Sequence, residues 1–531
     1  PQNPSPLHAK ATLFAQVGDW PNAIQNMSAY LAKRGEDMSS RKILIQYRIN
    51  GREYDKAEKE LDAILAKNPT DAQGLLLKAV LFRSRGLPAK AVAVATQAIE
   101  KHPEFTTALS VRASAYVIMG ELELALNDLE AARTISKTPQ IAMELADVYM
   151  KLGRESDAIL VLKSVVAEHQ TYENAEYKLI NAYLAAKDWS NAERQLASAQ
   201  ARFPKQPAFL LMEAHMWQMR EQNTKAVPVL AKAVALRRNL HTARVHLLGL
   251  MLAKEYDKAL TAANDYKTQK GWGVWVDACI GRILVAQKQD AKAKEIFQTT
   301  VKNATSGEMA FVVSQLSEAY GTKDAIERMT AWSKARPTDW YFKILIGDLC
   351  GVLVNDPDVT ITDAERAKYL NLARDSFLGA INKTKKTSEI AMLSNRLGKV
   401  YYDLGLPRDA EKAYKKCLEF TPNDNAALNN LAYLYVDDLN EPEKALPYVQ
   451  KVIRLRPQDP NVLDTYGWVM GKLKRYAEAK KYLQRSIERD PELAACRFHL
   501  GWIFEQTGDR KQAIKHYRLG LELVRNMTHL P

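Results

Sequence analysis

The sequence predicts an all-α protein in which pairs of helices stack into a solenoid. Hydrophobic residues make up 47% of the 531 positions, so the chain can bury a large core. Aromatic residues make up only 8%, and 23 glycines and 21 prolines suffice for brief turns between long helices. A small residue also recurs about every 34 positions along most of the chain.

This recurrence defines the helix pairs. The intervals between successive small residues are 33 to 35 residues, with one break after Ala293. The positions are Ala23, Ala57, Ala91, Ala125, Ala158, Ala192, Ala226, Ala259, Ala293, Ala410, Ala445, Ala479 and Ala513. Prolines keep the same interval at Pro69, Pro103, Pro204, Pro422, Pro457 and Pro491. Each unit is too small to bury its own apolar face, so it needs its neighbours.

One unit, "NRLGKVYYDLGLPRDAEKAYKKCLEFTPND", shows how each element is predicted. Apolar residues at helical spacing around Gly398 predict a first helix. Gly405 and Pro407 predict the turn. A second helix follows around Ala410, and Pro422 ends it because its ring cannot continue the helical ladder. Gly398 and Ala410 are small because the two helices are expected to cross closely there.

These sites resemble the tetratricopeptide repeat family over nearly the whole chain. The matching small, aromatic and proline sites are Gly398, Ala410, Tyr414 and Pro422, then Gly467, Ala479 and Pro491, then Gly501, Ala513 and Tyr517. The resemblance implies a right-handed α-solenoid of about fifteen helix-turn-helix units. The C-terminal array also resembles the repeat lipoproteins of bacterial envelope, exosortase and exopolysaccharide export systems. That likeness favours the periplasm or cell envelope over the cytoplasm.

The repeat phase divides the chain into three predicted segments: a regular array over 1–302, irregular repeats over 303–390, and a consensus-like array over 391–531. In the irregular segment, "SQLSEAYGTKDAIERM" is expected to have a shortened first helix. The stretch Asn355–Arg366 reads as an insertion between two helices. It is either a tolerated loop, as insertions in repeats usually are, or a docking loop or hinge.

Composition excludes several classes of protein. The net charge of +13 is spread along the chain, which favours acidic partners. The sequence has no dense basic stripe of the kind that binds nucleic acid, so we do not expect a nucleic-acid partner. No apolar run is long enough to span a membrane. No metal-ligand spacing, phosphate-binding loop or nucleophile motif occurs, so we expect neither a cofactor nor catalysis. The four cysteines are expected to be buried, and "GWGVWVD" is expected to form a turn and packing tryptophans.

In the tetratricopeptide repeat family, which this sequence resembles, the first helices of successive units line a concave groove. The predicted groove residues of the C-terminal array are Asn395, Arg396, Lys399, Asn429, Asn430, Tyr433, Asp464, Trp468, Lys472, Phe498, His499 and Trp502. Trp468 lies about 100° round the helix from Gly467 and would face this groove. Asparagines can pair with a peptide backbone, and Arg396 and Lys399 could meet carboxylates. Alternatively, all of them are solvated or packing residues.

The predicted function is a non-catalytic scaffold that presents its groove to a protein or peptide segment, and the positive net charge favours an acidic one. Two alternatives remain open: the substrate-binding arm of a larger sugar transferase, and a structural subunit that self-associates. The opening "PQNPSPLHAK" lacks a methionine, so we expect a processed chain without its targeting residues. No polar capping helix follows the last repeat, which suggests trimming or a partner at that end.

Overall fold

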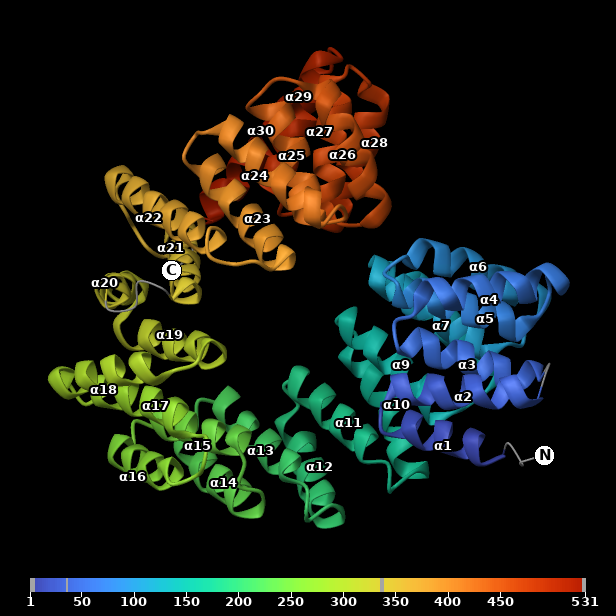
Figure 1. The fold of residues 1–531 in the computed structure, drawn as a ribbon, viewed down its shortest axis with the longest axis horizontal. Coiled ribbons are helices and arrows are strands. Elements are labelled where there is room, and N and C mark those ends of the chain that lie inside the picture. Colours follow the sequence, from blue (N-terminus) through green and yellow to red (C-terminus); the bar gives the residue numbers. More distant parts are fainter. Residues whose placement is uncertain (1–4, 35–36, 335–338, 528–531) are drawn as a thin grey trace. The chain divides into compact units, whose positions relative to one another are not determined.

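The computed structural model describes residues 5–34, 37–334 and 339–527, and every regular element in this part of the chain is an α-helix (Figure 1). Consecutive helices pair, and the thirty helices of the described residues therefore form fifteen units, as predicted. The chain divides into two compact units, one ending at Phe203 and the other beginning at Pro204. The segment boundaries after residues 302 and 390 stay a prediction.

The helices alternate between first and second members of the pairs. The first compact unit contains α1 (Ser5–Gln16), α2 (Trp20–Arg34), α3 (Met38–Asn50), α4 (Tyr54–Lys67), α5 (Ala72–Ser84), α6 (Pro88–Lys101), α7 (Thr106–Met119), α8 (Leu122–Ile135), α9 (Pro139–Lys151), α10 (Glu155–Glu168), α11 (Glu173–Ala185) and α12 (Trp189–Arg202). The second contains α13 (Pro207–Met219), α14 (Asn223–Leu236), α15 (Leu240–Leu252), α16 (Tyr256–Lys267), α17 (Gly273–Ala286), α18 (Asp290–Asn303), α19 (Ser306–Tyr320), α20 (Thr322–Ser333), α21 (Trp340–Asn355), α22 (Asp363–Ile381), α23 (Thr387–Asp403), α24 (Pro407–Phe420), α25 (Asn425–Asp437), α26 (Pro442–Leu455), α27 (Pro460–Lys472), α28 (Tyr476–Arg489), α29 (Ala494–Gln506) and α30 (Arg510–Met527).

The two helices of a pair cross where the sequence places its small residues. A Cβ atom on Gly398 would lie 2.6 Å from the ring of Tyr414, and one on Gly467 would lie 2.6 Å from Cγ of Leu483. Ala479 on the facing helix is 0% exposed. Small side chains at this crossing are therefore a packing requirement, as the sequence predicted.

Ala479→Leu should lower the free energy of unfolding of the second compact unit by about 1–3 kcal/mol, because extra methylenes overpack the crossing. Denaturant melts followed by circular dichroism measure the loss. Ala477→Leu is the matched control, since Ala477 lies exposed on the same helix. An unchanged midpoint for Ala479→Leu would show that α28 is not held this tightly against α27.

The turn that follows most first helices contains one residue with a left-handed backbone conformation. Glycine occupies this position in several repeats, as at Gly120, where φ is +78°. Other repeats place a charged residue there instead: φ is 54° at Lys187, 61° at Lys288 and 62° at Lys474. Some repeats therefore form this turn with glycine, which adopts the left-handed conformation without steric cost, and others form it with a larger residue.

The irregular segment differs from its prediction in two ways. The expected short first helix is wrong: α19 has 15 residues, and the connection is short instead, because Gly321 alone separates α19 from α20. The stretch Asn355–Arg366 is not wholly a loop either. Only residues 356–362 lie between α21 and α22. Asn355 ends α21, and residues 363–366 form the first turn of α22, where Thr362 and Glu365 form a capping box.

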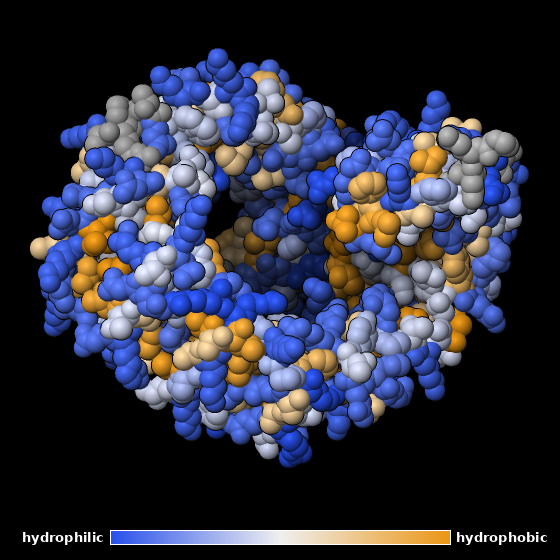
Figure 2. Space-filling model, turned by 60° about the horizontal axis from the view of Figure 1, so that its bottom comes forward, coloured by the Kyte–Doolittle hydropathy of each residue, from blue (hydrophilic) through white to orange (hydrophobic). Residues whose placement is uncertain are grey.

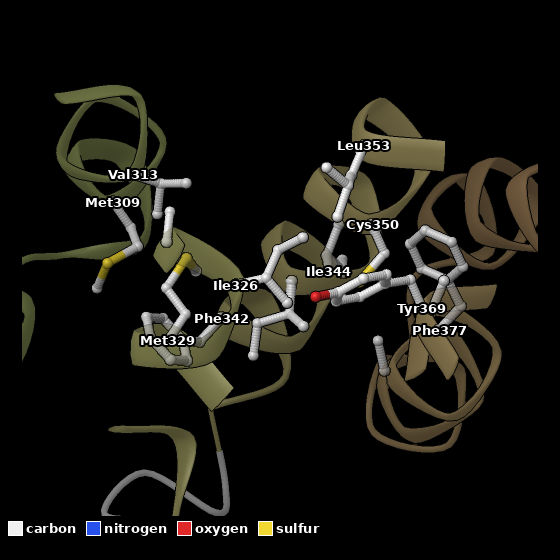
Figure 3. Close-up of a cluster of buried hydrophobic side chains, with 14 of the residues drawn as sticks. Met309, Val313, Ile326, Met329, Phe342, Ile344, Cys350, Leu353, Tyr369 and Phe377 are labelled. Atoms are coloured by element: carbon white, nitrogen blue, oxygen red, sulfur yellow. The ribbon is translucent and has the colours of Figure 1, made fainter. Parts of the chain in front are cut away.

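A continuous core runs through this segment (Figure 3). Phe342 of α21 and Tyr369 of α22 are each 0% exposed and lie in one cluster of buried side chains. The cluster reaches back to Ala278 of α17 and forward to Ala413 of α24. This packing favours a tolerated loop insertion over a hinge. Residues 335–338 of the segment lie outside the described residues.

Candidate functional site

Half of the predicted groove residues gather in one place on α25, α27 and α29. We call this set the C-terminal aromatic cluster; it comprises Tyr433, Asp464, Trp468, Lys472, His499 and Trp502. The ring of Trp468 stacks on His499 with centroids 4.2 Å apart and planes at 15°, and it meets Trp502 edge-on at 5.0 Å. Side chains from two consecutive units thus form one aromatic layer.

The polar members of the cluster are held inside it. Nδ1 of His499 lies 2.8 Å from Oδ1 of Asp464, and Nζ of Lys472 lies 4.6 Å from the ring centroid of Trp468. Lys472 also lies 5.2 Å from the ring of Trp502. The Lys472 ammonium therefore adds a cation–π contact to each of the two indoles.

Three of these residues correct the sequence prediction. Asp464, Trp468 and His499 are only 5%, 6% and 7% exposed, so they do not present open faces to a groove. The reason is geometric: a first helix packs against its own partner and also against the first helix of the next unit. The position one step round from Gly467 is consequently covered by α29.

The predicted carboxylate-binding cations already have carboxylates within the chain. Nη1 of Arg396 lies 2.7 Å from Oδ2 of Asp348, and Nζ of Lys399 lies 2.8 Å from Oδ2 of Asp403. Burial raises the pKa of Asp348, although the guanidinium of Arg396 opposes this shift. A partner carboxylate would have to compete with these ion pairs.

The remaining predicted residues have mixed surroundings. Nδ2 of Asn395 donates to Oδ1 of Asp424 at 3.5 Å. Burial raises the pKa of Tyr414, and the side chain of Asn430 opposes this shift. Phe498 is half-buried, and its ring lies over the backbone of Gly520. The structure therefore gives these residues a packing or bridging contact as well as part of an exposed surface.

Two of the predicted groove residues each have a buried polar atom that lacks a hydrogen-bond partner within the described residues. The atoms are Nε1 of Trp468 on α27 and Oδ1 of Asn429 on α25. The two helices contact each other. One atom is a donor and the other an acceptor, and a buried polar group left unpaired costs about 1–3 kcal/mol.

A second candidate site was missed by the sequence analysis. The first helices α15, α17 and α19 enclose a pocket of about 330 Å³, which we call the α15–α19 pocket. Its lining residues are His241, Arg244, Val245, Leu247, Leu248, Met251, Trp275, Cys279, Arg282, Phe311, Gln315 and Glu318. A further pocket of about 240 Å³ shares Met251, Arg282 and Glu318 with it, so the two form one groove.

A sequence signal could have revealed this pocket. Trp468 lies eleven residues before the small residue Ala479 of its unit, and Leu248 lies eleven residues before Ala259. Arg282 occupies the same position in the next unit. The position that was used to choose groove residues in the C-terminal array thus also selects two lining residues of the α15–α19 pocket.

The first compact unit has its own pocket on first helices. About 340 Å³ lies between α5, α7 and α9, lined by Ser110 and Ser114 of α7 and by Arg83 and Glu144 among others. Burial lowers the pKa of Arg83, while the charge of Glu144 opposes this shift. Hollows on the first helices therefore occur in both compact units.

Reactive groups are scarce in the described part of the chain. All four cysteines are buried and free, as predicted. Burial raises the pKa of Cys279 to about 12, so this thiol stays protonated at neutral pH and behaves as an apolar side chain. Within the described ranges, no three His, Cys, Asp or Glu side chains gather as a metal site, and no helix has the length and apolarity to cross a membrane.

Comparisons with solved structures give distant likenesses. The chain is 12% identical to a protein in the structure of Naa15/Naa10 bound to HypK-THB, covering 91% of this chain and 93% of that one with a TM-score of 0.42. For the Cut9–Hcn1 hetero-tetramer of APC/C the values are 15%, 94%, 96% and 0.36. A TPR repeat-containing protein of Pseudomonas aeruginosa is 33% identical over 93 residues, which span 17% of this chain and 15% of that protein.

Family models match much more of the chain. Two models, both described as tetratricopeptide repeat, match residues 149–216 and residues 8–72, 44–104, 76–139, 395–460 and 471–526. Together these ranges cover more than half of the sequence, and the fifteen helix pairs have the stacking that such repeats require. Repeats of this kind generally serve protein–protein interaction. The chain belongs to the tetratricopeptide repeat family.

Proposed function

We propose that this chain is a non-catalytic interaction scaffold whose C-terminal first helices bind an extended segment of a partner protein. The observation that carries the proposal is the pair of unpartnered buried atoms, Nε1 of Trp468 and Oδ1 of Asn429. A peptide backbone offers both an acceptor for the indole and a donor for the amide. Both atoms are covered in the free chain, so binding requires the side chains around them to move aside, and it would then satisfy two buried polar groups.

The other predicted groove residues divide between support and contact. The Asp464–His499 pair is buried and holds the ring of Trp468 in place. Lys472 and Trp502 are half-buried and would contact the partner directly. With the net charge of +13, the Lys472 ammonium favours an acidic segment. On the sequence resemblance, we place this scaffold in a bacterial cell envelope.

Affinity capture from the native source with mass spectrometry tests this function. We expect Asn429→Ala and Trp468→Phe to lose the proteins that the wild-type chain captures, because each removes one unpartnered atom while Phe keeps an aromatic ring on His499. Asn423→Ala is the control, since Asn423 is exposed in a turn. Folded variants that capture the same proteins as the wild type would contradict the proposal.

Two further measurements separate the alternatives. Sedimentation at several concentrations measures self-association. Self-association that persists in both variants would favour a structural subunit over a scaffold that binds a partner through this groove. A native gene product that continues into a catalytic domain would favour a transferase arm. Retained helicity in circular dichroism shows that a loss of captured protein is not a loss of fold.

A further inference from the structure

The α15–α19 pocket combines exposed apolar side chains with a buried donor. Hydrophobic side chains break the mainly hydrophilic surface in separate patches (Figure 2). Leu248 and Leu252 lie one turn apart on α15 and are 41% and 46% exposed, and each lines one of the two joined pockets. The ring of Phe311 lies 5.8 Å from that of Trp275, and both residues line the larger of the two pockets. A volume of about 330 Å³ lies within the range in which pockets hold ligands.

The polar groups of this pocket are unequally satisfied. Trp275 is 6% exposed, and its Nε1 has no hydrogen-bond partner within the described residues. The guanidinium of Arg244 lies 4.7 Å from the ring centroid of Phe311 and is exposed. By contrast, the carboxylate of Glu318 is paired with Arg282, which also donates to Oε1 of Gln315 at 3.3 Å.

The missing partners are therefore an acceptor and an anion. No carboxylate within ion-pair distance of Arg244 occurs in the described residues, and the indole of Trp275 can only donate. The only carboxylate of the lining is neutralised by Arg282. A ligand that complements this pocket must bring oxygen acceptors, a negative charge and an apolar group.

We propose that the α15–α19 pocket binds an acidic–apolar segment of a partner protein, with an Asp or Glu carboxylate on Arg244 and a leucine, methionine or phenylalanine side chain against Leu248 and Phe311. A carbonyl oxygen of the segment accepts from Nε1 of Trp275. This inference rests on the proposed scaffold function but concerns a second site, on helices other than those of the C-terminal aromatic cluster. The pocket lies between residues 216 and 395, where the matched ranges leave a gap.

Selection from a displayed random-peptide library on the full wild-type chain supplies the probe. We expect the enriched peptides to carry Asp or Glu close to Leu, Met or Phe. Synthetic versions of the enriched peptides are then titrated by fluorescence polarisation. A carboxylate on an arginine is a charge-assisted contact, so Arg244→Glu should weaken binding about tenfold or more. Trp275→Phe should also weaken it, because the donor is removed and an aromatic ring is kept.

Three controls make the outcome specific. Lys232→Glu makes the same change of charge as Arg244→Glu, but on α14, where Lys232 is exposed and lines neither pocket. Peptides with Asn and Gln in place of Asp and Glu should bind the wild-type chain about as weakly as the unaltered enriched peptides bind the Arg244→Glu variant. Asn429→Ala should leave peptide binding unchanged, and if it alone abolishes binding, the C-terminal groove is the site and this inference fails while the proposed function stands.

Other results would also overturn the inference. Enrichment of peptides without acidic residues, or no enrichment at all, removes the proposed ligand chemistry. Self-association that Arg244→Glu abolishes would identify a second copy of the chain as the occupant. Displacement of the peptide by a single-stranded oligonucleotide of mixed sequence, lost in Arg244→Glu, would assign the pocket to nucleic acid. Arg244→Lys keeps the charge, so it should retain more affinity than Arg244→Glu if the carboxylate contact is real.

Discussion

Trp468→Ala should destabilise the second compact unit by about 3–5 kcal/mol, the range for truncating a large buried aromatic side chain. Trp468 is 6% exposed, stacks on His499 and meets Trp502 edge-on. Removing its ring leaves a cavity between α27 and α29 and also uncovers the buried Asp464–His499 pair. Denaturant unfolding followed by circular dichroism, with hydrogen exchange of α27 and α29, measures the loss.

Trp502→Ala is the matched control, because the same substitution is made on the adjacent half-buried indole. Its cost should be clearly smaller, since less surface leaves the core. A loss within about 0.5 kcal/mol for Trp468→Ala would be the behaviour of an ordinary surface residue. That result would restore the sequence interpretation, in which Trp468 faces an open groove and contributes only to partner binding.

Phe342→Ala should cost a similar 3–5 kcal/mol, and its effect should spread beyond its own helix pair. Phe342 is 0% exposed and belongs to the cluster that joins α17 to α24. Because long arrays need not unfold all at once, hydrogen exchange with mass spectrometry is the suitable measurement. We expect protection to fall in α19 and α23 as well as in α21 and α22.

Phe209→Ala provides the comparison for this variant. Phe209 is also 0% exposed but lies on α13, outside that cluster. It should lose protection around α13 and leave α21 unchanged. If the wild-type chain already exchanges rapidly throughout 303–390, or if the effect of Phe342→Ala stops within α21 and α22, the segment is a hinge between two separately stable arrays.

The repeat interval, together with the family resemblance, predicted the fold. A small residue every 33 to 35 positions reflects a steric requirement at each crossing, as the contact between Gly398 and Tyr414 shows. Such a requirement is local, so it can be recognised without knowing the neighbouring units. The error at α19 has the same origin: the interval reports the distance between crossings, and it does not say whether the helix or its turn has been shortened.

The candidate sites depended on contacts between units, which the sequence pattern does not contain. Trp468 was assigned to the groove from its angle on α27 alone, yet the following first helix covers it through His499. Lys399 was expected to be available, but Asp403 lies one turn further along the same helix and pairs with it. The α15–α19 pocket arises from three helices. Lining residues such as Arg244, Leu248 and Arg282 occupy the repeat positions used to predict the groove, but those positions do not show that three helices enclose a hollow.

The left-handed turn residues have a consequence for how stability is distributed along the array. A side chain in this backbone region costs about 1–2 kcal/mol, and glycine does not bear that cost. Lys187, Lys254, Lys288 and Lys474 all occupy it, whereas Gly86 and Gly120 occupy the equivalent turns of α5 and α7. Replacing the lysine with glycine at one of these turns should therefore stabilise that repeat. We therefore expect a repeat whose turn carries lysine to open at a lower free-energy cost than the same repeat would with glycine at that position.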